Sequence, residues 1–178
     1  MLSFKENNIF KKGDSNIMPA KSPESNKEMI IMQYKRTIES VEKLVHLSEE
    51  QWRSPIDEHG RTIAEIIGHL IPWDEYVINE RIPVFKAQIG DLPRPPQDDV
   101  INTPASIRSK TESKDTIIKS FITVRESLIE LIKELDEKLW RDDVTFSIGK
   151  SILTLHQYFS GLIEHDLLHF KEIENAIK

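Results

Sequence analysis

The chain has 178 residues, a formal net charge of −6 and no cysteine. The lack of cysteine excludes disulfides, thiolate catalysis and zinc–thiolate sites, so any bound metal must be held by nitrogen and oxygen ligands. The acidic balance argues against nucleic acid as a partner, because phosphate backbones are bound by clustered Lys and Arg.

The first 26 residues are polar and contain Gly13, Pro19 and Pro23. They lack the apolar stretch of about 7–15 residues that forms the core of a signal peptide. This composition predicts a flexible N-terminal extension over residues 1–26 and one folded domain over residues 27–178. No apolar run in the chain approaches the ~20 residues of a membrane span. We therefore expect a cytoplasmic protein with no membrane contact.

Apolar residues recur at spacings of three and four in four segments, which predicts four amphipathic helices. Two of these helices should begin with capping boxes, formed by Thr62 with Glu65 and by Thr154 with Gln157. The sequence thus predicts an all-α fold, a four-helix bundle. The expected helices run from about Glu24 to Leu47, from Thr62 to Arg81 or Ile82 before Pro83, from about Lys114 to Leu139, and from Thr154 onward.

The remaining segments are predicted from their prolines and glycines. Pro72 lies inside the second helix and removes its hydrogen bond to Gly68, so we expect a kink near His69. Val144–Ile148 is a candidate short extended piece. Residues from about Ile89 to Asp115 hold four prolines and should be irregular. A connection of this length is unusual in a compact domain, which suggests that it covers a site or serves in association.

Two histidines one turn apart are the first sign of chemistry. His165 and His169 are four residues apart, on the same expected face as Leu155, Leu162 and Ile173. Two imidazoles at this spacing can chelate one ion, and neutral imidazole suits zinc, nickel or iron. The alternative is a pair of core or surface histidines whose hydrogen bonds are satisfied. Their position on the apolar stripe favours the metal interpretation.

Two segments carry a resemblance to a known family. TIAEIIGHLIPWDEY (Thr62–Tyr76) and TLHQYFSGLIEHDLLHFKEI (Thr154–Ile173) resemble the two signature regions of the DinB-like superfamily, and the order of elements matches from about residue 27 to 178. The resemblance implies a four-helix bundle in which His69, His165 and His169 bind a divalent metal ion. Three histidine ligands leave coordination positions open, as in catalytic sites. The family includes thiol-dependent transferases and isomerases, so the resemblance supports the site more than any one reaction.

Two carboxylates and two aromatic residues accompany the histidines. Asp74 lies near the middle of the second helix's apolar stripe, where it could act as a general base or orient a ligand, or could be an exposed helix-end residue. Asp166 projects inward and could pair with Arg125 or lie at a helix boundary. Trp73 and Tyr76 could line a pocket beside the metal, but core packing is the better interpretation. The other histidines, at 46, 59 and 156, are expected to be solvated or capping residues.

Two functions follow from these observations. The first is a metal-dependent hydrolase or thiol S-transferase that acts on a small-molecule substrate, with water or a low-molecular-weight thiol as the activated nucleophile. The second is a non-catalytic bundle that binds a ligand or protein, with the metal structural or absent and the Ile89–Pro104 segment as the contact surface. A homodimer through exposed helix faces is compatible with both.

Overall fold

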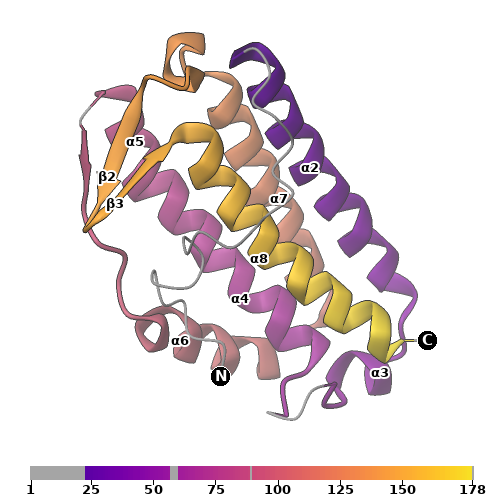
Figure 1. The fold of residues 1–178 in the computed structure, drawn as a ribbon. Helices are drawn as coiled ribbons and strands as arrows, with labels where there is room; N and C mark the ends of the chain where they lie inside the picture. The colour runs from indigo at the N-terminus through magenta and orange to yellow at the C-terminus, as the bar shows by residue number, and fades with distance from the viewer. Residues whose placement is uncertain (1–22, 57–59, 89, 178) are drawn as a thin grey trace.

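The computed structural model describes residues 23–56, 60–88 and 90–177, and four long helices dominate it (Figure 1). The all-α four-helix bundle is therefore confirmed. In the described part of the chain, no helix is long and apolar enough to cross a membrane. Residues 1–22, most of the predicted extension, lie outside the described residues. The long helices are α2 (Pro23–Lys43), α4 (Ile63–Tyr76), α7 (Lys114–Lys133) and α8 (Leu155–Ala176).

The bundle encloses its core between two pairs of helices. α7 packs between α2 and α4 on one side, and α8 lies against both on the other. α4 and α8 approach each other least closely of these neighbouring pairs. Side chains therefore have room in the space between α4 and α8. Buried aromatic and aliphatic residues fill two clusters, one around Trp140, Phe85 and Phe159 and the other around Trp52, Ile66 and Phe121.

The second predicted helix continues further than expected. α4 begins with the predicted capping box of Thr62 and Glu65. After Tyr76 the chain forms a π turn, η2 (Val77–Arg81), and then α5 (Ile82–Lys86). The predicted end before Pro83 was therefore wrong. Proline is tolerated in the first turn of a helix, where its missing N–H needs no partner, so Pro83 lies in the first turn of α5.

The segment from Ile89 to Asp115 was predicted to be irregular, and this prediction was wrong. It contains the short strand β1 (Asp91–Leu92) and a 14-residue helix, α6 (Asp98–Thr111). Sequence periodicity misses α6 because its buried face consists of the small residues Ala105 and Ser109. Pro104 lies on the exposed side of α6, where the carbonyl that it leaves unbonded can reach water.

α6 crosses the lower half of α4 and packs closely against it (Figure 1). Gly68 makes this approach possible, because a Cβ there would lie 1.9 Å from Ser109 Oγ. Ser106 Oγ donates to Glu65 Oε1 at 2.6 Å. Arg53 donates to the carbonyls of Ser109, at 3.1 Å, and Glu112, at 2.7 Å, which satisfies the C-terminal end of α6.

A small sheet closes the opposite end of α4. β2 (Thr145–Ile148) and β3 (Ser151–Thr154) form an antiparallel hairpin, and β1 pairs in parallel with β2. β2 confirms the predicted extended piece, whereas β3 was not predicted. Gly149 adopts φ 59° in the hairpin turn, a conformation that favours glycine. The remaining short helices are η1 (Leu44–His46), α3 (Glu49–Arg53) and η3 (Glu137–Trp140).

Candidate metal centre

His69 from α4 and His165 and His169 from α8 come together in the space between the two helices. The potential ligand atoms of the three residues all lie within 4.8 Å of one another. Their ring centroids are 4.6 Å (His165–His169), 4.7 Å (His69–His169) and 5.7 Å (His69–His165) apart. Among the described residues, no other group of three or more histidine or carboxylate side chains is arranged to hold a metal ion. His69, His165 and His169 are the three residues that the spacing and the family resemblance singled out; their binding of a metal ion stays a prediction.

The outer nitrogen of each ring faces a hydrogen-bond acceptor. His69 Nδ1 lies 3.3 Å from the carbonyl oxygen of Glu65. His169 Nδ1 lies 2.9 Å from Glu172 Oε2. His165 Nδ1 lies 3.7 Å from Asp166 Oδ1, within the range of an electrostatic contact. An acceptor at Nδ1 places the ring proton there and leaves the Nε2 lone pair for a metal ion, an arrangement that metal-binding histidines commonly share.

The two α8 histidines are separated by a distance suited to a shared ion. Their Nε2 atoms are 3.3 Å apart. Two imidazole nitrogens bound to one tetrahedral zinc ion at the usual bond length are about 3.4 Å apart. A modest movement of the His69 ring would then complete a three-nitrogen site.

Burial keeps His69 neutral. Desolvation, with smaller contributions from the neighbouring His169 and His165, lowers the pKa of His69 to about 3. A metal ligand must be the unprotonated imidazole. His69 is therefore ready to coordinate a cation throughout the physiological pH range without losing a proton.

A buried ion network lies directly beside the histidines. Arg125 on α7 donates from Nε to Asp74 Oδ2 and from Nη1 to Asp166 Oδ2, both at 2.6 Å. Its Nη1 atom also lies 3.2 Å from Thr37 Oγ1 on α2. One guanidinium therefore joins all four long helices. The predicted pair of Asp166 with Arg125 is confirmed, and Asp166 connects this network to His165.

The two carboxylates share one positive charge and differ in acidity. Burial raises the pKa of Asp74 to about 7, although Arg125 opposes this shift. Burial also disfavours ionisation of Asp166, but the contacts with Arg125 and His165 hold its pKa below the usual range. Asp166 is thus the carboxylate that stays ionised beside the histidines. In the described structure, Asp74 contacts Arg125 rather than a histidine, so its predicted role as a general base remains a prediction.

Several residues of the site were missed from the sequence. Glu172 contacts His169 and is itself 3.3 Å from Arg61. Glu172 lies three residues after His169 on the same helix, and this spacing was the signal in the sequence that could have predicted their contact. Arg125 was predicted as a partner of Asp166 but not of Asp74. The pair of Asp74 with Arg125 joins α4 to α7, and nothing in the sequence indicated it.

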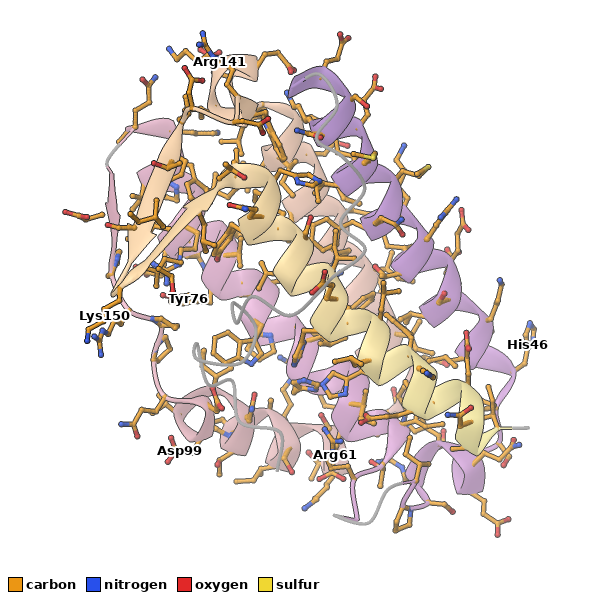
Figure 2. All side chains as sticks on the ribbon, in the orientation of Figure 1. His46, Arg61, Tyr76, Asp99, Arg141 and Lys150 are labelled. Carbon is orange, nitrogen blue, oxygen red and sulfur yellow. The ribbon has the colours of Figure 1, made fainter. Side chains whose placement is uncertain are left out.

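The other candidates lie outside the cluster. His46 is exposed at the far end of α2 (Figure 2), and His59 lies outside the described residues. His156 is in the first turn of α8, where burial lowers its pKa. Trp73 is buried, as predicted, and its Nε1 donates to Asn102 Oδ1 at 2.9 Å. Trp73 also contacts the partly exposed Tyr76, with 5.9 Å between ring centroids.

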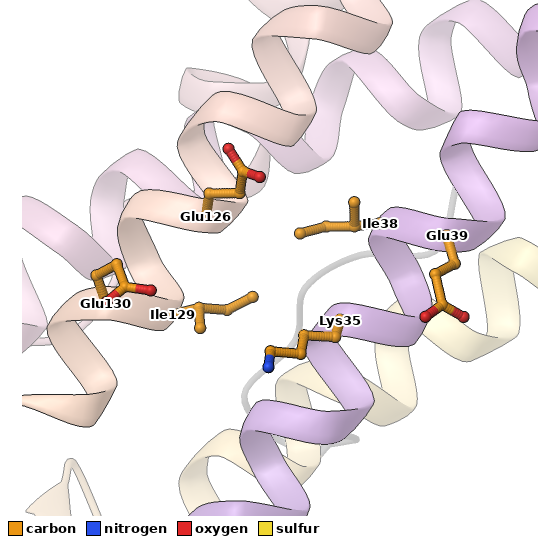
Figure 3. A pocket seen from close by; sticks show the side chains of 6 residues that line it. All are labelled: Lys35, Ile38, Glu39, Glu126, Ile129 and Glu130. Atoms are coloured by element: carbon orange, nitrogen blue, oxygen red, sulfur yellow. The ribbon is translucent and has the colours of Figure 1, made fainter.

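A cavity elsewhere on the bundle lacks comparable chemistry. It lies between α2 and α7, has a volume of about 470 Å³ and contains none of the three histidines (Figure 3). Three glutamates, one lysine and two isoleucines line it, with no histidine among them. The histidine cluster therefore remains the candidate centre. The lining residues are Lys35, Ile38, Glu39, Glu126, Ile129 and Glu130.

Comparison with known proteins agrees with this geometry. Residues 33–173 match the DinB superfamily. The chain belongs to the DinB superfamily. Among solved structures it resembles YfiT from Bacillus subtilis, described as "a probable metal-dependent hydrolase with an unusual four-helix bundle topology". The TM-score is 0.70 at 18% identity, over 96% of this chain and 95% of that chain, so the likeness shows a shared fold. No curated protein matches the chain.

Proposed function

We propose that this DinB superfamily member is a divalent-metal-dependent enzyme whose ion is held by His69, His165 and His169. The observation that carries the proposal is the convergence of three imidazoles within 4.8 Å, with an acceptor beside each Nδ1 atom. Imidazole ligands suit zinc, nickel or iron. Buried histidines in general have hydrogen-bonded ring nitrogens, so the convergence of three rings is what favours a metal ion.

Hydrolysis is the reaction that the proposal places first. A divalent ion with open positions lowers the pKa of bound water or of a bound thiol, which supplies a nucleophile near neutral pH. The description of YfiT as a probable metal-dependent hydrolase supports water as the nucleophile. The chain has no cysteine. In a transfer reaction, the thiol would therefore have to be a second substrate, such as a low-molecular-weight thiol.

The chain's own residues would hold and tune the centre. Glu172 fixes the ring of His169, and the backbone carbonyl of Glu65 fixes that of His69. Asp166, kept ionised by Arg125, lies 3.7 Å from His165 Nδ1 and would favour the tautomer whose Nε2 faces the ion. The carboxylates of Asp166 and Glu172, each beside a histidine, also favour a cation over an anion at the centre.

An activity screen after metal removal and reloading tests the proposal. Untagged protein would be treated with a chelator, reloaded with zinc, nickel or iron, and assayed with ester, amide and thiol-transfer substrates. We expect activity to disappear with the metal, to return on reloading and to be lost in His165→Ala. His46→Ala, a change at an exposed histidine, is the matched control. Full activity of His165→Ala would contradict the proposal.

The alternative is a non-catalytic module that binds a ligand or a protein. Most of the segment suggested as its contact surface is now occupied by β1 and α6, although Val100 and Ile107 on α6 remain exposed. Failure of the purified protein to bind a divalent ion would favour this alternative. Assembly as a homodimer and location in the cytoplasm stay predictions.

A further inference from the structure

Arg81 is a second buried arginine, and its surroundings differ sharply from those of Arg125. Both residues are 1% exposed. Arg125 is neutralised by two carboxylates at 2.6 Å. Among the described residues, no carboxylate lies within ion-pair distance of Arg81, and its Nε and Nη1 atoms have no hydrogen-bond partner. The interior thus holds one guanidinium with its counterions and one without.

An uncompensated guanidinium is costly to bury. Removing an ion from water costs several kcal/mol unless a counterion and hydrogen bonds replace the lost hydration. The Arg81 Cζ atom lies 4.9 Å from the centre of the Tyr76 ring. Such a cation–π contact offsets part of this cost but accepts no N–H hydrogen bond in the guanidinium plane. The planar N–H groups of Arg81 therefore remain available to an acceptor that is not part of the described structure.

The π turn determines where this guanidinium lies. The N–H of Ile82 donates to the carbonyl of Val77, the five-residue spacing of a π turn. In a regular α-helix, Arg81 would lie about three and a third turns after His69, and the two residues would point about 120° apart around the helix axis. The π turn is wider than an α-helical turn, so each of its residues advances by a smaller angle around the axis. This smaller advance brings Arg81 back toward the face of the helix that carries His69. Single π turns of this kind are frequent at functional sites.

A short row of aromatic contacts leads from Trp73 to Arg81. Trp73 follows His69 by one helical turn and is anchored to Asn102 on α6. The Trp73 ring contacts that of Tyr76, which in turn contacts Arg81. Tyr76 lies on the stretch of α4 that is nearer the β2–β3 hairpin, whereas Arg61 marks the other end (Figure 2). The row therefore follows one side of α4 away from the histidines.

The geometry points to Arg81 as the binding residue for an oxyanion, a carboxylate or phosphate, carried by a small-molecule ligand. Planar guanidinium groups bind both anions through two parallel N–H···O hydrogen bonds. His69 and Arg81 are twelve residues apart, a rise of about 18 Å along the helix. A ligand that reached both positions would be an extended molecule with its anionic group remote from the metal. This last step rests on the proposed function; the oxyanion site itself does not.

Anion binding can be measured directly on the full chain. Metal-free and metal-loaded protein would be titrated with inorganic phosphate and, separately, with acetate at constant ionic strength, by calorimetry and thermal unfolding. The variants are Arg81→Met, which removes the charge at similar volume, and Arg81→Lys, which keeps it. Arg141→Met changes an exposed arginine that pairs with Asp143 and is the matched control.

We expect saturable binding of at least one of the two anions to wild type and to Arg141→Met, in both metal states. Binding should weaken at least tenfold in Arg81→Met and less in Arg81→Lys. Arg81→Met should fold, because replacing an unpaired buried charge by an apolar side chain is often stabilising. Equal binding by wild type and Arg81→Met, or no binding of either anion, would overturn the inference. Either result would leave the metal analysis of the histidines unaffected.

Discussion

The Nη1 atom of Arg125 lies 2.6 Å from Oδ2 of Asp166, the residue that follows His165 in the chain. The other carboxylate oxygen of Asp166 faces His165 Nδ1 at 3.7 Å. A side chain on α7, which carries none of the three histidines, thus acts on a candidate metal ligand through a single intermediate. The buried charges of the bundle and the candidate metal centre form one connected structure.

Asp166→Asn should impair both stability and metal binding. Removing one partner of a buried ion pair typically costs about 3–5 kcal/mol, and loss of a carboxylate behind a ligand typically lowers metal affinity about 10–100-fold. Asp74→Asn should cost less, because burial already raises the pKa of Asp74 to about 7. Urea unfolding of metal-free protein and competitive zinc titration measure both effects. Wild-type zinc affinity in Asp166→Asn would contradict the role of Asp166.

Glu172→Gln should weaken metal binding with little effect on stability. Glu172 is partly exposed and holds His169 Nδ1 at 2.9 Å, so the change removes a charged acceptor from behind a ligand. We expect about tenfold lower zinc affinity and an unfolding midpoint close to that of wild type. Glu174→Gln, an exposed change on the same helix, is the control. Equal zinc affinities in the two variants would argue against this orienting contact.

The stability of the metal-free protein should fall on acidification because of His69. Its pKa is lowered to about 3 in the folded state, against about 6.5 in the unfolded chain. As the pH falls, the unfolded chain therefore takes up the proton before the folded protein does. The contribution of neutral His69 to the free energy of unfolding is fully present above pH 6.5 and is lost toward pH 3. This contribution is on the order of 5 kcal/mol.

Urea unfolding across this pH range compares wild type with His69→Gln and with His46→Gln, a change at an exposed histidine. His69→Gln should flatten the dependence, and His46→Gln should preserve it. A pH dependence of stability that survives unchanged in His69→Gln would show that other groups cause it.

Gly68→Ala should displace α6 from α4. The added Cβ would lie 1.9 Å from Ser109 Oγ, so Ser109 or the whole helix must move. Overpacking of this kind typically costs about 1–3 kcal/mol. Gly90→Ala introduces the same methyl group where nothing lies within 4 Å and should be nearly neutral. Thermal unfolding of both variants gives the comparison, and equal unfolding temperatures would contradict the close packing at Gly68.

The sequence predicted the elements that have strong local signals. The four long helices follow from apolar periodicity, and the capping boxes at Thr62 and Thr154 mark the starts of α4 and α8. α6 was missed because its buried residues are small, and because Pro104 and the three prolines that precede the helix suggested a loop. Local signals thus suffice where a helix buries large apolar residues and fail where it buries Ala105 and Ser109.

The residues of the candidate site also differ in how far the sequence alone predicts them. His165 and His169 share a helix, so their spacing alone places them together. His69 required the resemblance to a family. The pair of Asp166 with Arg125 was predicted. The second pair, of Asp74 with Arg125, and the unpartnered guanidinium of Arg81 depend on how separate helices pack and on the π turn at η2, and these had to come from the structure.

Calorimetric titration of zinc into metal-free protein tests the central claim most directly. We expect saturable binding of one ion per chain for wild type and for His46→Ala. Single alanine substitutions of His69, His165 or His169 should each weaken binding by at least a hundredfold. Absence of saturable zinc binding to wild type, or binding that persists when all three histidines are replaced, would contradict a three-histidine metal centre.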